Sequence, residues 1–236
     1  KGENMNKELF LEELKKLGIL LTPKQEQDLD TYYKLLISYN NNVNLTAITK
    51  EEDVYLKHFY DSLTLFKGID LKENLKICDL GTGAGFPGLV LKIVFPNLSI
   101  TLVDSLEKRI KFLDLVIKEL ELKNIKTVHS RIEEFKEIEA FDVVVSRAVA
   151  KINILLELGC NIPKVNGLFV FMKGNVLEEL KSAKNALKVL NYSLEKIINF
   201  KLPIEESERN IVILKHTSPT SNKYPRQFSI IKKKPL

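Results

Sequence analysis

Cysteine and histidine are scarce in this chain. Its 236 residues include two cysteines and three histidines. Cys78 falls in an apolar run and Cys160 in a helical run, so we expect small core residues and no disulfide framework. The histidines, His58, His129 and His216, are scattered, and His58 is expected to be a packing residue rather than a catalyst. No cluster of side chains has metal-ligand spacing, so no bound metal is predicted.

Long apolar runs are also missing. No stretch approaches the length of a membrane span, and the N-terminus lacks the pattern of a signal peptide. These absences favour a cytoplasmic protein without a membrane partner. Hydrophobic residues make up 44% of the chain, enough for one α/β domain with an attachment, or for two small domains. Nothing in the pattern indicates an obligate dimer, so a monomer is expected.

Acidic residues are absent from the last part of the chain. Residues 215–236 contain six lysines and arginines and no acid, a charge of +6 against +5 for the whole chain. The remaining residues therefore sum to −1, and the positive excess lies entirely in this tail. A basic, proline-containing tail favours contact with nucleic acid. The alternative is a solvated, poorly ordered terminus.

The first part of the chain has helical patterning. Helices are predicted over Asn6–Leu17, from Pro23 to about Tyr39, and from Thr49 to about Phe66. The second of these follows a capping box formed by Thr22 and Gln25, with proline at the first helical position. The third is predicted to begin with another capping box, Thr49-x-x-Glu52. Residues 1–66 are therefore expected to form an N-terminal helical extension.

From Lys76 onward the pattern alternates between strands and helices. Strands are predicted over Lys76–Leu80, Ser99–Val103, Lys126–His129, Phe141–Val145, Leu168–Met172, Tyr192–Leu202 and Arg209–Lys215. Helices are predicted over Leu89–Phe95, Glu107–Leu122, Ile152–Ile162 and Val176–Leu190. Five alternating strands and a closing hairpin predict an α/β fold, with a Rossmann-like, seven-stranded, mostly parallel sheet and one reversed strand. The core is expected over 67–215 and the basic tail over 216–236.

A glycine-rich turn follows the first predicted strand. Residues 77–88 read ICDLGTGAGFPG, in which a strand leads through a glycine loop into a helix, as in nucleotide-type binding turns. Gly83-x-Gly85-x-x-Gly88 matches a dinucleotide fingerprint, whereas Asp79-x-Gly81-x-Gly83 is typical of S-adenosylmethionine sites. The Asp79 carboxylate repels a pyrophosphate and suits a cationic ligand. An acid after the second strand, Asp104, can hold the ribose of either cofactor. The closing hairpin favours a methyltransferase, while an NAD-dependent oxidoreductase stays open.

Basic residues collect at the same edge of the predicted sheet, because ligands lie at the carboxyl ends of parallel strands. The basic residues after the strands are Lys108, Arg109, Arg131, Arg147, Lys173 and Arg209. Each one alone is more often a solvated surface charge. Together they favour an RNA substrate, since guanidinium groups suit phosphates.

The absence of certain motifs reduces the set of methylation reactions that this chain is expected to catalyse. The position after the fourth strand reads VSRAV, without the Asn/Asp-Pro-Pro-aromatic motif of amino-methylating enzymes. Neither cysteine is placed to be the nucleophile of a C5-pyrimidine enzyme. No general base is evident. Methylation of guanine N7 needs none, because N7 attacks with a free lone pair and catalysis can rest on positioning.

Several segments resemble the bacterial small-subunit rRNA guanine-N7 methyltransferases, the RsmG or GidB family. The matching segments are NLTAI at 44–48, His58 with DSL at 61–63, GTGAGFPG at 81–88, VDS at 103–105, Lys108-Arg109, Phe112-Leu113, Arg131 with Glu133, SRAVA at 146–150, Lys173-Gly174 and KYPR at 223–226. The resemblance covers nearly the whole chain. Tyr39, Ser229 and Ile231 depart from the family pattern, which puts the conformation of the tail in doubt but leaves the glycine loop intact.

This resemblance implies a class I methyltransferase that transfers a methyl group from S-adenosylmethionine to N7 of guanine 527 in 16S rRNA. Together with the strand-end reasoning, it gives Gly81, Gly83, Phe86, Asp104, Ile132, Glu133 and Arg147 as cofactor-binding residues. The expected RNA-binding residues are Lys108, Arg109, Arg131, Lys173, Arg209 and Arg226. Arg147 is the one candidate for a catalytic role. The implied partner is 16S rRNA or the small ribosomal subunit, and an inactive RNA-binding module is the non-enzymatic alternative.

Overall fold

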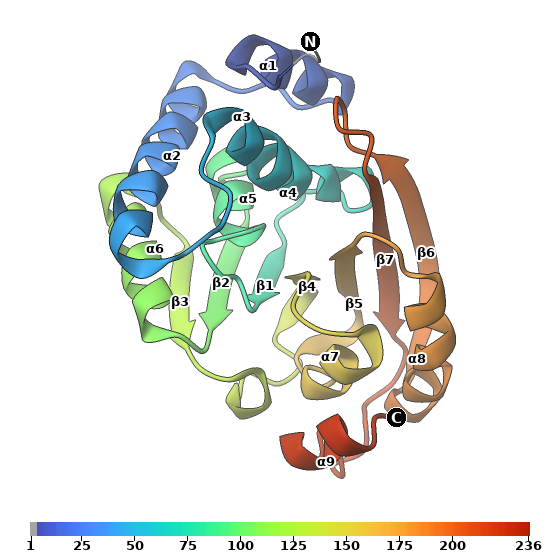
Figure 1. Cartoon of the computed structure of the whole chain (residues 1–236). Helices are drawn as coiled ribbons and strands as arrows, with labels where there is room; N and C mark the ends of the chain where they lie inside the picture. The colour runs from blue at the N-terminus through green and yellow to red at the C-terminus, as the bar shows by residue number, and fades with distance from the viewer. Residues whose placement is uncertain (1–3) are drawn as a thin grey trace.

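One twisted sheet organises the molecule. A computed structural model describes residues 4–236, which build a seven-stranded sheet with helices on both faces (Figure 1). The strands are β1 (Lys76–Leu80), β2 (Ser99–Asp104), β3 (Ile125–His129), β4 (Phe141–Arg147), β5 (Pro163–Lys173), β6 (Tyr192–Lys201) and β7 (Glu208–His216). The helices are α1 (Lys7–Lys16), α2 (Pro23–Val43), α3 (Glu51–Val54), η1 (Tyr55–Tyr60), α4 (Asp61–Leu63), η2 (Thr64–Lys67), α5 (Gly88–Val94), α6 (Glu107–Glu119), η3 (Ile132–Glu134), α7 (Ile152–Leu158), α8 (Leu177–Leu190) and α9 (Phe228–Lys233).

The strand order confirms the predicted topology. Along the sheet the order is β3-β2-β1-β4-β5-β7-β6, with parallel pairing from β3 through β5. β7 runs antiparallel to both of its neighbours, β5 and β6, and is the one reversed strand of this sheet. The order changes direction on either side of β1, where β2 and β4 both pair with it. In open α/β sheets such a switch point is where ligands bind.

Each face of the sheet has its own hydrophobic core. The larger core joins the N-terminal helices α1 to α4 to α5, α6 and one face of the strands. The smaller core packs α7 and α8 against the other face, through residues such as Phe169 and Leu156. The glycine loop contributes Phe86 to the larger core, so the N-terminal helices pack directly on the loop.

Local signals explain how the N-terminal helices begin and end. The Thr22–Gln25 capping box forms as predicted, with reciprocal bonds between the side chains and backbone N–H groups. α2 continues to Val43, one turn beyond the predicted end, and stops at Asn44 in the left-handed region (φ 50°). Asparagine tolerates that conformation better than most residues, which makes it a suitable terminator.

The second predicted capping box is wrong. The helix begins at Glu51, with Lys50 at its N-cap and no capping hydrogen bond from a side chain. The single helix expected to reach Phe66 is divided into α3, η1, α4 and η2. η1 is a turn of π-helix, a geometry that is often found near functional sites. Burial of Phe59, Tyr60 and Leu63 among the N-terminal helices, the glycine loop and α5 overrides the local capping signal.

The basic tail folds back onto the molecule, so the poorly ordered terminus considered above is not what the structure shows. The Arg226 guanidinium donates to both carboxylate oxygens of buried Glu157 on α7, at 2.7 Å each. Beyond it, α9 packs on α7 with Ile231 fully buried. Within residues 4–236, no helix combines the length and apolar character that a membrane crossing requires.

Candidate functional site

The largest cavity lies at the carboxyl ends of β1, β2 and β4. Its volume is about 790 Å³, within the range of small-molecule binding sites. The predicted residues that line it are Gly81, Gly83, Phe86, Asp104, Arg109, Arg131, Ile132, Glu133 and Arg147. The fold therefore brings every cofactor residue expected from the sequence to one cavity. Lys108 and Lys173 do not line it, and Arg209 and Arg226 also lie elsewhere.

Asp79 holds the glycine loop from beneath. Its side chain is fully buried, and one carboxylate oxygen accepts from the Thr82 hydroxyl at 2.7 Å and from the backbone N–H of Gly88 at 2.8 Å. Burial raises the pKa of Asp79 to about 7. Asp79 lies under the loop, as expected, and does not line the cavity itself; its effect on the choice of ligand stays a prediction. It fixes the loop and the start of α5.

The loop leaves room for a ligand at Gly83. This residue has φ of 61°, and a Cβ placed there meets no other atom within 4 Å. The backbone N–H of Gly83 donates to Asp104 at 2.9 Å. At Gly81 (φ 68°), by contrast, a Cβ lies 2.7 Å from Val149. Gly81 is therefore required by packing and conformation, while Gly83 leaves a bare stretch of backbone facing the cavity.

Asp104 is placed to meet a ribose. It ends β2 with 2% exposure and lines the cavity. One oxygen accepts from Gly83 N–H and the other accepts from Leu106 N–H at 3.0 Å. Arg109 approaches the same carboxylate at 3.3 Å. Arg109 Nη1 also reaches the second oxygen at 3.5 Å, so both oxygens already have two donors, and two vicinal hydroxyls are held where they replace these long arginine contacts. An adenosyl ligand fits this arrangement of carboxylate and open glycine backbone.

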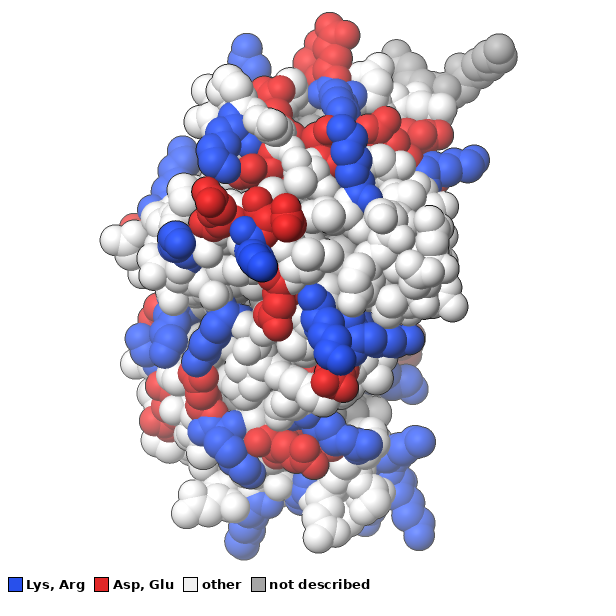
Figure 2. Space-filling view, turned by 90° about the vertical axis from the view of Figure 1, so that its left-hand side faces the viewer, with Lys and Arg blue, Asp and Glu red and all other residues white. Residues whose placement is uncertain are grey.

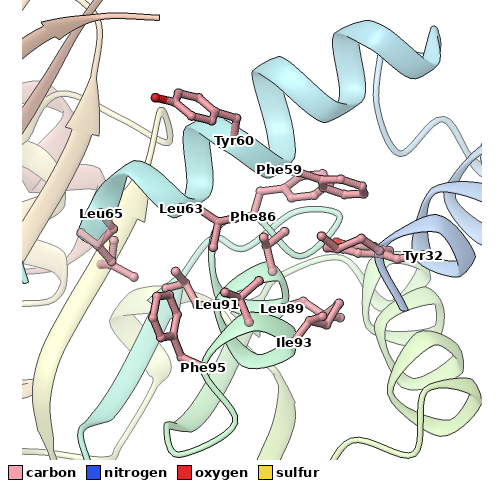
Figure 3. Packing of buried hydrophobic residues seen from close by; sticks show 14 of the residues in the cluster. Tyr32, Phe59, Tyr60, Leu63, Leu65, Phe86, Leu89, Leu91, Ile93 and Phe95 are labelled. Carbon is pink, nitrogen blue, oxygen red and sulfur yellow. The ribbon is translucent and has the colours of Figure 1, made fainter. Parts of the chain in front are cut away.

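Aromatic packing positions Phe86 at the inner wall. Tyr32 of α2 stacks on Phe86 with ring centres 5.6 Å apart, and its hydroxyl donates to the backbone carbonyl of Ala84. Figure 3 shows Tyr32, Phe59 and Phe86 grouped above Leu89 of α5. The N-terminal helices thus fix the glycine loop from the side opposite to the sheet.

His58 joins this wall, which the sequence did not indicate. Its ring stacks on Phe86 with centres 4.2 Å apart and planes 9° from parallel. Burial and the nearby Arg147 lower the pKa of His58 to about 3, so the ring is neutral. A neutral ring accepts from Arg147 at Nδ1 (2.9 Å) and donates from Nε2 to the hydroxyl of Thr46 (3.0 Å). The expected packing role is present, but His58 also lines the cavity and anchors Arg147.

Arg147 ties the end of β4 to the N-terminal helices. Besides His58, its guanidinium donates to the carbonyl of Lys57 at 2.8 Å and to Asp61 at 3.3 Å, and it lies 5.3 Å from the centre of the Phe86 ring. Burial lowers the pKa of Arg147, and Asp61 opposes that shift. With these partners, Arg147 is a fixed positive wall of the cavity.

A second cavity lies behind Arg147. It has a volume of about 250 Å³ and shares His58, Arg147 and Ala148 with the first cavity. Lys173 and Arg209, both expected to contact RNA, line this second cavity. Lys173 donates to the carbonyl of Ala150 at 2.6 Å and pairs with Glu179. This cavity could not be predicted from the sequence, because its walls come from segments far apart in the chain.

The expected RNA-binding residues divide into exposed and engaged groups. Lys108 is exposed at the start of α6, and the Arg131 side chain is 64% exposed with one loose contact to Glu133 at 3.8 Å. Arg209 is half-buried and pairs with Asp61 at 3.3 Å. Arg226 binds Glu157 and so anchors the tail. Only the exposed group has its positive charge largely free for a phosphate.

The tail completes the wall of the first cavity. Phe228 and Lys232 of α9 line it beside Ile154 and Leu158 of α7.

On the face that carries α2 and α6, positive and negative side chains are interspersed, and the positive side chains, drawn in blue, become more frequent toward the lower end (Figure 2). Among residues 4–236, no group of three or more His, Cys, Asp or Glu side chains is arranged to hold a metal ion.

Comparisons with known proteins agree with this geometry. The family model described as rRNA small subunit methyltransferase G matches residues 25–212. Ribosomal RNA small subunit methyltransferase G of Bacillus velezensis is 46% identical over 98% of this chain and 99% of its own length. The protein of the same name from Bacillus subtilis is 45% identical over the same shares.

Solved structures show the same fold at low sequence identity. A SAM-dependent methyltransferase from Aquifex aeolicus superposes with a TM-score of 0.54 at 18% identity, over 72% of this chain and 96% of that one. M. jannaschii TYW2 in complex with AdoMet superposes with a TM-score of 0.52 at 14% identity, over 66% and 74% of the two chains. These likenesses show that the fold is shared.

Proposed function

Because this chain belongs to the rRNA small subunit methyltransferase G family, we propose that it transfers a methyl group from S-adenosylmethionine to N7 of guanine 527 in 16S rRNA. One observation carries the proposal. The largest cavity lies at the switch point of the sheet and combines the buried Asp104 carboxylate with the open backbone of Gly83. The family match leaves no support for the oxidoreductase alternative.

The cavity residues fit the parts of S-adenosylmethionine, whose sulfonium supplies the activated methyl group. Asp104 accepts from the ribose hydroxyls. Ile132 and Glu133, in η3 after β3, lie on either side of the adenine. Gly81, Gly83 and Phe86 surround the methionine portion. Asp104 and Glu133 also give this cavity acidic groups, which favour a cationic ligand over a dinucleotide pyrophosphate.

Methyl transfer to guanine N7 requires the protein mainly to position the base and the cofactor. Guanine N7 has a lone pair and no proton, so the attack needs no general base. Arg147 is held by three partners and stays fixed beside the reacting atoms. A guanidinium held in this way can orient the base without having to reorganise during the reaction, and its contribution is geometric, because both the sulfonium and the methylated base are cationic. We assign Arg147 a positioning role at the boundary between cofactor and base.

The exposed basic residues are proposed to hold the RNA. Lys108 and Arg131 flank the mouth of the cavity and contact phosphates, whereas Lys173, Arg209 and Arg226 already pair with acidic side chains. Affinity for RNA is therefore expected to fall steeply with salt. We further propose that the protein acts as a monomer on the small ribosomal subunit in the cytoplasm. We also propose the division expected from the sequence: a helical extension over 1–66, of which residues 1–3 lie outside the described part of the chain, a methyltransferase core over 67–215 and a tail over 216–236.

The direct test compares 16S rRNA from cells with and without this protein. Aniline cleaves RNA at N7-methylguanine, and primer extension then stops at that position. We expect the stop in cells that have the protein and its loss in cells that lack it. A stop of equal strength in both refutes the proposed function. Return of the stop with the wild-type gene but not with an Asp104→Ala gene distinguishes an active enzyme from an RNA-binding module.

A further inference from the structure

The cavity behind Arg147 has no role in the function proposed so far. Its volume of about 250 Å³ lies below the range of pockets for drug-sized ligands, so it suits a small rigid group. Apolar walls come from Ile48, Met172, Phe200 and Ile211. Because His58, Arg147 and Ala148 line both cavities, a group held in the smaller cavity lies next to the larger one.

Asp61 gives the smaller cavity a carboxylate wall. It is the one acidic residue that lines this cavity within the described chain, and it is 6% exposed. Arg209 Nε lies 3.3 Å from one oxygen and Arg147 Nη1 lies 3.3 Å from the other. Both contacts are longer than typical charge-assisted hydrogen bonds. Each oxygen keeps a free lone pair, so Asp61 can accept two more donors side by side.

This carboxylate argues against a phosphate as the occupant. A phosphate placed here meets a buried negative charge, and the nearby cations already have acidic partners. Lys57 pairs with Asp53 and Glu205. Lys173 pairs with Glu179. A flat group that carries two adjacent N–H donors suits the site better.

We propose that the smaller cavity receives the target guanine and that Asp61 recognises it, an inference that rests on the proposed function. Among the four RNA bases, only guanine presents two adjacent donors on one edge, N1–H and the N2 amino group. Both donate to the Asp61 carboxylate. N7 lies at the far side of the purine and therefore points back across Arg147 into the larger cavity. Phe200 gives the base an aromatic surface on which to stack.

The test removes one donor from the base and one acceptor from the protein. Small subunits are reconstituted from ligated 16S rRNA with either guanosine or inosine, which lacks the N2 amino group, at position 527. Methyl transfer is measured for wild type, Asp61→Asn and Asp142→Asn. Asp142 is a matched control, because it is also an ion-paired aspartate but lies at the opposite end of β4.

Wild type and Asp142→Asn are expected to prefer guanosine over inosine by about tenfold or more in kcat/KM, the selectivity of one good bidentate contact. In Asp61→Asn this preference falls toward one, because a carboxamide has a single acceptor oxygen. Affinity for S-adenosylmethionine, measured by calorimetry, stays at the wild-type value. An unchanged guanosine preference in Asp61→Asn overturns the inference, and so does tighter RNA binding without a change in preference, which is the signature of a phosphate site.

A second variant covers the possibility that Asp61→Asn does not fold. Phe200→Ala alters the half-buried edge strand and leaves the ion pairs in place. Loss of stacking is expected to lower kcat/KM about tenfold for both bases, without changing the preference between them. Wild-type kcat/KM in this variant counts against the cavity as the base site. If wild type fails to methylate the guanosine subunits, the proposed function itself fails, which is a different result from either of these.

Discussion

The edge of the sheet at which the two cavities lie has two halves, and these are held together in different ways. At the ends of β1 and β2, the carboxylates of Asp79 and Asp104 accept from backbone N–H groups of the loops that follow. At the ends of β4 and β7, Asp61 accepts from the side chains of Arg147 and Arg209. The first half fixes a backbone shape, whereas the second fixes the position of charges.

The sequence distance within these contacts also differs. The carboxylate contacts of the first half join residues 9 and 21 positions apart. In the second half, Arg147 contacts Asp61 and His58 across 86 and 89 positions. A local network can hold once its loop forms, while the second needs the N-terminal helices in place. The first half, which lines the proposed cofactor site, therefore depends on the sheet and its loops. The second half, which is proposed to hold the base, depends on the packing of the N-terminal helices as well.

The largest effect is expected from breaking the second half. Arg147→Ala leaves the buried carboxylate of Asp61 with Arg209 as its remaining partner and leaves His58 without its donor. The free energy of unfolding, from urea denaturation, is expected to fall by about 3–5 kcal/mol. Arg131→Ala, an exposed arginine, should change it by less than about 0.5 kcal/mol. Equal stability of the two variants would show that the second half does not depend on the contact between Arg147 and Asp61.

The first half is expected to respond to pH through Asp79. Its pKa is raised to about 7 in the folded protein, against about 3.9 for an unfolded aspartate. Between these values the folded state binds the extra proton, so the stability supplied by Asp79 falls as pH rises. Relative to Asp79→Asn, which does not titrate, the free energy of unfolding of wild type should fall by about 1.4 kcal/mol per pH unit from pH 5 to 7. A pH-independent difference between the two proteins contradicts the assignment.

Asp104 links the first half to cofactor binding. Asp104→Ala removes the acceptor of Gly83 and Leu106 together with the proposed ribose contact. Calorimetry with S-adenosylmethionine should show affinity about a hundredfold weaker, the loss of hydrogen bonds to a charged group. Asp114→Ala, an exposed aspartate on α6, is the control and should bind like wild type. Unchanged affinity in Asp104→Ala would disprove the ribose assignment.

The smallest effect is expected from the tail, which belongs to neither half. Arg226→Ala breaks the contact with Glu157, so the wall formed by α9 loosens. Affinity for S-adenosylmethionine should fall about threefold to tenfold, the weight of about one hydrogen bond. Lys223→Ala removes the same charge from an exposed position and should leave this affinity unchanged. Equal effects of both variants on RNA binding alone would make the tail a purely electrostatic contact.

The sequence predicted the first half far better than the second. The mostly parallel sheet with one reversed strand follows from hydrophobic periodicity, which is a local pattern. Gly81, Gly83 and Asp104 follow from the glycine loop and the strand ends, whereas Phe86 was implied by the family resemblance. Asp79 lies beneath the loop as the motif predicts, and its effect on the choice of ligand stays a prediction. His58 was expected only to pack, since nothing local places a histidine beside an arginine 89 positions away.

The side-chain partners of the basic residues could not be predicted from the sequence either. The tail predicted a free positive surface, yet Arg226 is committed to Glu157 across 69 positions. A charge count registers the arginine but not the buried acid that it meets. The broken helix over residues 51–67 shows the same limit, because aromatic burial there decides the backbone geometry.

The place of α9 in the cavity wall has a consequence for the order in which the binding site forms. Phe228 and Lys232 line the cavity, yet both come after the last strand of the sheet in the chain. Chains fold from the N-terminus during synthesis, so the sheet and the glycine loop can form before α9 leaves the ribosome. The cavity therefore gains this wall after the rest of the fold, and a chain that is cut after β7 has the sheet without that wall.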